Sequence, residues 1–146
     1  MNTSTSPIST QVDTTSVPLT SRVDNDDQVA GMWTTPVSVT ANNFVYKSLS
    51  NWAVNLAVGC SHACRFCYVP SAATIKQKPK LVKFGISDPD AQWGKYVLLR
   101  PWDEKTFRSS LVKAESTPLS KLKPDGNRAI FYCSTTDPYQ IIRHPI

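Results

Sequence analysis

Three cysteines, Cys60, Cys64 and Cys67, lie within eight residues, directly after a short apolar segment of the chain. That segment, residues 52–58, alternates large side chains with small or polar ones, which predicts a β-strand whose large side packs under helices. Its small, partly polar side suits the inner wall of a barrel. We expect Gly59 to end the strand and Cys60 to begin a loop, so that the spacing C-x3-C-x2-C brings three thiolates together.

The number of thiols in this loop favours a reactive metal cluster. Cytosolic thiols stay reduced, so clustered cysteines there indicate a metal site before they indicate disulfides. Structural zinc sites and ferredoxin-like clusters use four protein ligands, whereas three ligands leave one metal open to bind a reactant. Two alternatives stay open: a zinc site that His62 or Cys133 completes, and thiols that hold no metal.

The sequence carries no signal for secretion or for insertion into a membrane. Its first residues lack a basic start followed by an apolar stretch, and no apolar run is long enough to cross a bilayer. We therefore expect a cytoplasmic protein with no membrane partner.

Composition divides the chain into two parts. Residues 1–40 hold nine Thr and six Ser, one Arg against four Asp, and no apolar pattern long enough to form a core. We expect residues 1–45 to be a disordered Ser/Thr-rich leader and residues 46–146 to fold. The folded part then carries the positive charge, because the whole chain has a net charge of +5. Such a surplus is compatible with a polyanionic partner or with a solvated basic surface.

The predicted elements after the cysteine loop follow the order of a βαβ unit. Residues 71–94 combine lysines with Pro and Gly, as loops do, so we interpret them as an insertion. Residues 95–100 predict a short strand, residues 103–114 a helix, and residues 129–133 a strand buried on both faces. The result is an α/β fold in which residues 134–137 follow a parallel strand, at the edge of the sheet where active sites lie.

The segment Gly59 to Pro70, GCSHACRFCYVP, resembles the cluster loop of the radical SAM superfamily, in which an aromatic residue precedes the third cysteine. Phe66 occupies that place. His62, Tyr68 and the later motif T-D-P-Y-Q at residues 136–140 are similar to the spore photoproduct lyase-like group of this superfamily. The resemblance spans about residues 52–140 and covers only the N-terminal portion of such a protein. It implies the beginning of a partial, TIM-like (β/α) barrel that is truncated here.

The resemblance also implies cofactors and roles for individual residues. The three cysteines would ligate three irons of a 4Fe-4S cluster, and S-adenosyl-L-methionine would bind the fourth iron and be cleaved reductively to a 5′-deoxyadenosyl radical. Phe66 would approach the adenine, and the amino group of this nucleoside cofactor would bind at the run Ser134, Thr135 and Thr136. A flavodoxin-like or ferredoxin-like protein would supply the electron, and the substrate could be a nucleic acid. The alternative is a non-catalytic fragment that binds zinc or an iron-sulfur cluster.

Three further features allow two interpretations each. Cys133 ends a strand, where a buried cysteine is usually a packing residue, although its position would also suit a hydrogen-atom donor. Asp137 either starts a turn with Pro138 or touches cofactor or substrate. The lysines of residues 76–83 form either a solvated loop or a nucleic-acid contact.

Overall fold

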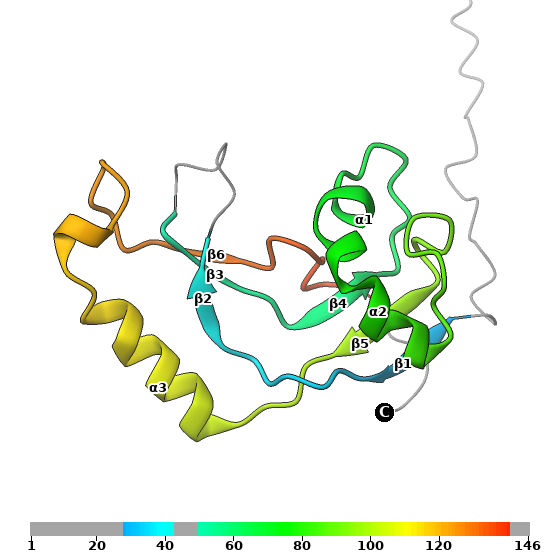
Figure 1. Ribbon diagram of the computed structural model, residues 1–146, viewed down its shortest axis with the longest axis horizontal. Coiled ribbons are helices and arrows are strands. Elements are labelled where there is room, and N and C mark those ends of the chain that lie inside the picture. Colours follow the sequence, from blue (N-terminus) through cyan, green and yellow to red (C-terminus); the bar gives the residue numbers. More distant parts are fainter. Residues whose placement is uncertain (1–27, 43–49, 141–146) are drawn as a thin grey trace, which may run out of the picture.

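A computed structural model describes residues 28–42 and 50–140 of the chain (Figure 1). The described residues form two three-stranded sheets, one longer helix and a group of short helices. The elements are, in chain order, β1 Val29–Met32, β2 Val39–Ala41, β3 Trp52–Val54, β4 Ala57–Cys60, α1 Val69–Ala72, η2 Thr74–Gln77, α2 Lys78–Leu81, η3 Val82–Phe84, β5 Tyr96–Leu99, α3 Glu104–Glu115, η4 Leu119–Lys121 and β6 Ile130–Tyr132.

The first sheet has the order β1-β5-β4. β5 runs parallel to β1 and antiparallel to β4, with Cys60 opposite Tyr96. The strand predicted at residues 95–100 is therefore confirmed as β5. Tyr96, Val97 and Leu98 are completely buried, and Tyr96 and Leu98 pack in one core cluster with Trp33, Val58, Leu81 and Ile86.

The second sheet has the order β2-β3-β6, with β2 antiparallel and β6 parallel to β3. The helix predicted at residues 103–114 is confirmed as α3. The predicted βαβ unit of strand 95–100, helix and strand 129–133 is wrong, because β5 and β6 belong to different sheets and β6 pairs with β3 instead. Asp103 caps this helix by accepting a hydrogen bond from the Thr106 amide at 2.7 Å. The Ser110 hydroxyl accepts a hydrogen bond from the Val39 amide at 2.9 Å and so attaches α3 to β2.

The single strand predicted at residues 52–58 is wrong, because the segment forms two strands in different sheets. β3 ends at Val54 and β4 begins at Ala57. The Arg100 amide donates to the Leu56 carbonyl at 2.8 Å, and beyond this point the chain leaves β5 for α3. β4 can therefore pair with β5 only as far as Leu56. β4 also continues through Cys60, which lies in a strand and not, as predicted, in the loop.

The prediction of a disordered leader over residues 1–45 is wrong for residues 28–42, which contain β1 and β2. Residues 1–27 and 43–45 lie outside the described residues. Trp33 and Val39 of this segment are buried, in two different core clusters. Both positions are covered by residues that are distant in the chain, so no local apolar pattern indicated them.

The interpretation of residues 71–94 as an insertion without packed elements is also wrong. Short helices occupy residues 69–84, and Leu81 and Ile86 are completely buried beside Tyr96. In Figure 1, α1 and α2 lie over the end of the molecule that contains β4 and β5. The sequence conceals this packing because lysines and prolines surround its few apolar anchors.

β6 is exposed, although residues 129–133 were predicted to be buried on both faces. Ile130, Phe131 and Tyr132 are between 37% and 53% exposed. β6 is an edge strand of the second sheet, with β3 as its neighbour. An edge strand has a neighbouring strand on one side only, which leaves its residues more accessible to solvent.

The described residues thus form a small mixed α/β structure. The partial barrel stays a prediction, and the antiparallel pairs β2–β3 and β4–β5 are not part of a regular series of β/α units. Over residues 28–42 and 50–140, every helix is too short or too polar to cross a membrane.

Candidate functional site

A pocket of about 310 Å³ lies where β4 and β6 end, and all four cysteines of the chain line it. Cys60 is the last residue of β4, and Cys133 directly follows β6. β6 runs parallel to β3, so the residues after β6 continue alongside the residues after β3. The hydrogen bond from Thr136 to Gly59 places them beside the cysteine loop. The other residues that line the pocket are His62, Val69, Trp93 and the run Ser134, Thr135, Thr136, Asp137 and Pro138.

Gly59 allows β4 to enter the cysteine loop in close contact with β5. Its φ is +91°, and a Cβ at this position would lie under 3.0 Å from the backbone oxygen and the ring of Tyr96. A side chain is therefore excluded both by the left-handed backbone and by the space. The loop itself contains a tight turn in which the Cys67 amide donates to the Cys64 carbonyl at 3.0 Å.

The three loop cysteines differ in their exposure to solvent. Cys60 is 7% exposed, whereas Cys64 is exposed and Cys67 is partly exposed. Burial raises the pKa of the Cys60 thiol, and the backbone amides of His62 and Asp137 partly oppose this shift. The pocket therefore presents one buried thiol at its base and two more accessible thiols toward its mouth.

Asn55 orders the polar run after β6, a role that the sequence analysis missed. Its Oδ1 accepts hydrogen bonds from the Thr135 amide at 2.9 Å and from the Thr135 hydroxyl at 3.0 Å. Its amide nitrogen donates to the Ser134 hydroxyl at 3.3 Å. An asparagine in the middle of the apolar segment 52–58 was the available signal, because a strand interior rarely contains Asn without a hydrogen-bonding role.

Thr136 and Asp137 connect the run after β6 to the cysteine loop. The Thr136 hydroxyl donates to the Gly59 carbonyl at 2.6 Å. Asp137 Oδ2 lies 3.4 Å from His62 Nε2, and both side chains are about two-fifths exposed, at 42% and 43%. Asp137 therefore contacts the loop residue His62 as well as accepting a hydrogen bond from the Tyr139 amide in a local turn.

The structure brings together all of the predicted site residues except Phe66. Ser134, Thr135 and Thr136 line the same pocket as the cysteines, whereas Phe66 is 91% exposed and does not line it. Cys133 is 8% exposed, has a φ of +55°, and its pKa is raised by burial. A left-handed conformation at a residue other than glycine costs energy and is more frequent at functional sites than elsewhere.

Thiols are the ligand type of both iron-sulfur clusters and zinc sites. Thiolates are the ligands of such clusters, and three of them come from one loop. Among residues 28–42 and 50–140, no three Cys, His, Asp or Glu side chains are grouped closely enough to hold one metal ion. Thiolates that each bind a different iron of a cluster do not need to converge on one point. The three loop cysteines could ligate such a cluster, and Cys133 lines the same pocket.

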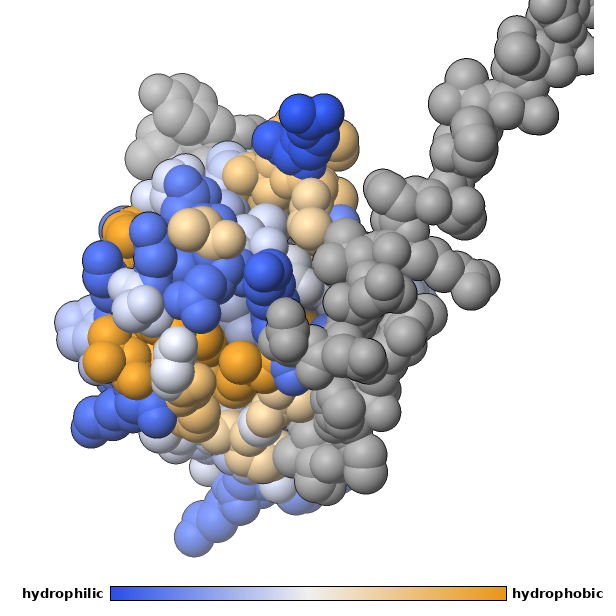
Figure 2. Space-filling model, turned by 90° about the vertical axis from the view of Figure 1, so that its right-hand side faces the viewer, coloured by the Kyte–Doolittle hydropathy of each residue, from blue (hydrophilic) through white to orange (hydrophobic). Residues whose placement is uncertain are grey.

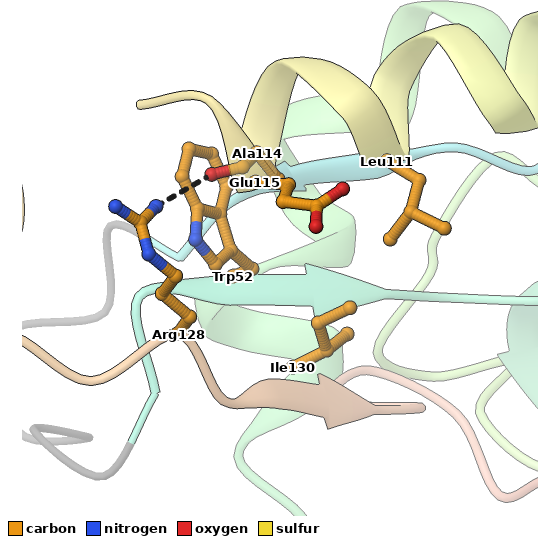
Figure 3. A pocket seen from close by; sticks show the side chains of 6 residues that line it. All are labelled: Trp52, Leu111, Ala114, Glu115, Arg128 and Ile130. Carbon is orange, nitrogen blue, oxygen red and sulfur yellow. Dashed lines mark hydrogen bonds between the residues drawn. The ribbon is translucent and has the colours of Figure 1, made fainter. Parts of the chain in front are cut away.

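A second pocket, of about 370 Å³, lies between α3 and the strands β3 and β6 and contains none of the predicted site residues (Figure 3). Arg128 spans its edge by donating to the Ala114 carbonyl at 3.1 Å. Its lining is mostly apolar, with Trp52, Leu111 and Ile130 on its walls. We therefore place the candidate site in the cysteine pocket, where the side chains that can carry chemistry lie.

Comparison with known proteins assigns no family to the chain. No protein-family model matches it, and no solved structure matches it. The chain is similar to "Uncharacterized protein ORF301" of Acidianus two-tailed virus, with 35% identity over 101 residues. The aligned part is 67% of this chain and 28% of the viral protein, so the chain spans well under half of that protein's length. The name of this relative describes no activity.

Proposed function

We propose that the cysteine pocket holds a 4Fe-4S cluster on Cys60, Cys64 and Cys67 and binds S-adenosyl-L-methionine, as the resemblance to radical SAM proteins of the spore photoproduct lyase-like group implies. The observation that carries the proposal is that these three cysteines line one pocket together with the polar run after β6. When bound, the cluster and S-adenosyl-L-methionine would supply a 5′-deoxyadenosyl radical that abstracts a hydrogen atom from the substrate.

The protein's own residues place and shield the bound groups. Three ligands leave one iron open, which is the vacancy that a reacting molecule needs. Ser134 and Thr135 are held by Asn55 at the pocket wall, where their remaining hydrogen-bonding groups can contact the amino group of the nucleoside. Phe66 is exposed beside the pocket and would contact adenine only by closing over it.

Cys133 is our candidate for a hydrogen-atom donor in this reaction. Its thiol belongs to the same pocket as the loop cysteines, and burial raises its pKa, so it carries the S–H bond at neutral pH. In the proposed step this S–H bond breaks and a C–H bond forms on the substrate radical. The reductant protein then returns one electron to the sulfur, and solvent returns the proton.

The proposal includes a protein reductant of the flavodoxin or ferredoxin type, a cytoplasmic location and a possible nucleic-acid substrate. The four lysines of residues 76–83 are exposed on short helices near the pocket. On the face shown in Figure 2, hydrophilic residues are interspersed with hydrophobic ones. We therefore regard nucleic-acid binding as the part of the proposal that needs its own test, by titration at several salt concentrations.

Anaerobic reconstitution with iron and sulfide tests the proposal. We expect about four irons per chain, and formation of 5′-deoxyadenosine after reduction in the presence of S-adenosyl-L-methionine. Cys64→Ser should abolish cluster formation, whereas Cys133→Ala should keep the cluster and change the product distribution. Uptake of tight zinc with no brown iron-sulfur chromophore would refute the proposal. Unchanged turnover and products in Cys133→Ala would remove this residue as the hydrogen-atom donor.

The alternative function is a non-catalytic site for zinc or an iron-sulfur cluster. It is favoured by the position of Cys133, which brings a fourth thiol into the pocket. His62 is a weaker candidate for the fourth ligand, because its Nε2 lies 3.4 Å from the Asp137 carboxylate. If this alternative holds, the variants Cys133→Ala and Cys64→Ser should each lose the metal. If the proposed function holds, Cys133→Ala should keep the cluster, so this variant distinguishes the two functions.

A further inference from the structure

The motif T-D-P-Y-Q of residues 136–140 forms a set of hydrogen bonds around Cys60. Gln140 Oε1 accepts from the Ser61 amide at 2.9 Å, and Gln140 Nε2 donates to the Thr136 hydroxyl at 3.0 Å. The Thr136 hydroxyl in turn donates to the Gly59 carbonyl at 2.6 Å. The contacts join residues that are 77 and 79 positions apart in the chain.

These hydrogen bonds hold the peptide groups on both sides of Cys60. The carbonyl of Gly59 precedes this cysteine, and the amide of Ser61 follows it. On its other side β4 pairs with β5, where Cys60 lies opposite Tyr96. β6 ends at Tyr132, before the chain passes the end of β4. The side chains of Thr136 and Gln140 therefore make the hydrogen bonds that a neighbouring strand would make there.

The side chains of Gln140 and Thr136 both donate and accept hydrogen bonds within this set. Gln140 engages both its acceptor and its donor, and Thr136 uses its single O–H on Gly59. The Thr136 hydroxyl therefore has no proton left to donate to a cofactor while the set is intact. Its hydrogen bonds to Gly59 and Gln140 give Thr136 a supporting role beside Cys60.

We propose that Gln140 is a positioning residue that, through Ser61 and Thr136, fixes Cys60 for binding to the cluster. The proposal rests on the proposed function for the identity of the bound group, although the hydrogen bonds themselves do not. Gln140 does not line the pocket and acts through the backbone around Cys60.

The test compares Gln140→Leu with Gln140→Glu and with a control, Asn51→Leu. Leucine removes both hydrogen bonds of Gln140, whereas glutamate keeps an acceptor for the Ser61 amide. Asn51 makes a matched pair of bonds at the other end of the same chain segment, since it accepts from the Lys123 amide and donates to the Asn127 carbonyl. It is 8% exposed, so its loss should destabilise the fold at least as much.

The first measurement is the rate at which iodoacetamide alkylates each cysteine of the full metal-free chain, resolved by mass spectrometry. We expect Cys60 to react about tenfold faster in Gln140→Leu, which is the change that about 1.4 kcal/mol of lost stabilisation produces. Gln140→Glu should react at an intermediate rate. Asn51→Leu should leave Cys60 unchanged, and Cys133 should react equally in wild type and both Gln140 variants.

The second measurement uses the reconstituted protein. In Gln140→Leu, a chelator should remove iron several-fold faster than in wild type, and the electron paramagnetic resonance lines of the reduced cluster should broaden. Gln140→Glu should restore much of the wild-type behaviour.

The outcomes separate the two proposals. A wild-type chain that takes up no cluster refutes the proposed function, while the alkylation rates still test the role of Gln140. Equal Cys60 rates in wild type and Gln140→Leu would overturn the positioning role. Equal acceleration in Gln140→Leu and Asn51→Leu would also overturn it, because general destabilisation would then explain the effect.

Discussion

Replacement of Gly59 by alanine tests how closely the cysteine loop is attached to the first sheet. The residue has a φ of +91°, and a Cβ there would lie under 3.0 Å from the backbone oxygen and the ring of Tyr96. Tyr96 cannot withdraw, because it is completely buried and belongs to the central strand of its sheet. The variant must therefore strain Gly59, displace β4 from β5, or both.

The expected loss of stability has two parts. A left-handed alanine costs about 1–2 kcal/mol, and forcing an extra carbon into a packed core costs about 1–3 kcal/mol. The total is about 2–5 kcal/mol, out of about 5–15 kcal/mol for a typical domain. The matched control is Gly126→Ala, where φ is +64° but no atom lies within 4 Å of the new Cβ. It should lose only the first part.

Urea unfolding followed by tryptophan fluorescence measures the difference. Trp33 belongs to the core cluster around Tyr96, and Trp93 packs against that cluster, so both report on this region. A difference of about 2 kcal/mol between the variants, divided by a slope of about 2 kcal/mol per molar urea, separates their midpoints by about 1 M. Equal midpoints would show that the space beside Gly59 is not restricted, and the close approach of β4 to β5 would be refuted.

Three further predictions concern the helix cap, the core tyrosine and the polar run. The hydrogen bond from Thr106 lowers the pKa of Asp103. As pH falls below about 4 and through the folded-state pKa, wild type should therefore lose more stability than Asp103→Asn. Urea midpoints of the two proteins that stay parallel from pH 6 to pH 2.5 would contradict this. Burial raises the pKa of Tyr96, whose phenol donates to the Pro89 carbonyl at 3.1 Å. Its stabilising contribution should be complete below about pH 10 and decline above it, a decline that Tyr96→Phe should lack in alkaline unfolding curves. Asn55→Ala should cost about 1–3 kcal/mol and speed amide hydrogen exchange in the run after β6, and unchanged exchange would reject its role there.

The local elements with strong internal patterns were predictable from the sequence. α3 has an acidic cap at its start and a basic residue near its end, and both are encoded within the helix itself. β5 is a compact run of apolar residues, and this pattern is contained in the segment itself. The grouping of Cys60, Cys64 and Cys67 is likewise local, because all three lie within eight consecutive residues.

The elements that depend on distant partners were not predictable. β1 lies in a Ser/Thr-rich segment with a weak pattern of its own, and it forms a strand because β5 offers a parallel neighbour. The break at residues 55–56 arises where β5 leaves the sheet, which an alternating pattern does not reveal. β6 has the sequence of a buried strand and yet lies at an edge.

The sequence alone thus brought three candidate thiol ligands close together, because their type and spacing are properties of one short stretch, the cysteine loop. Only the tertiary structure decided what faces that loop. Cys133 reaches it because β6 runs parallel to β3, and Gln140 reaches it across 79 positions of the chain. Contacts of this kind depend on how sheets pair, and strand pairing is set by the packing of the whole fold and not by any single segment.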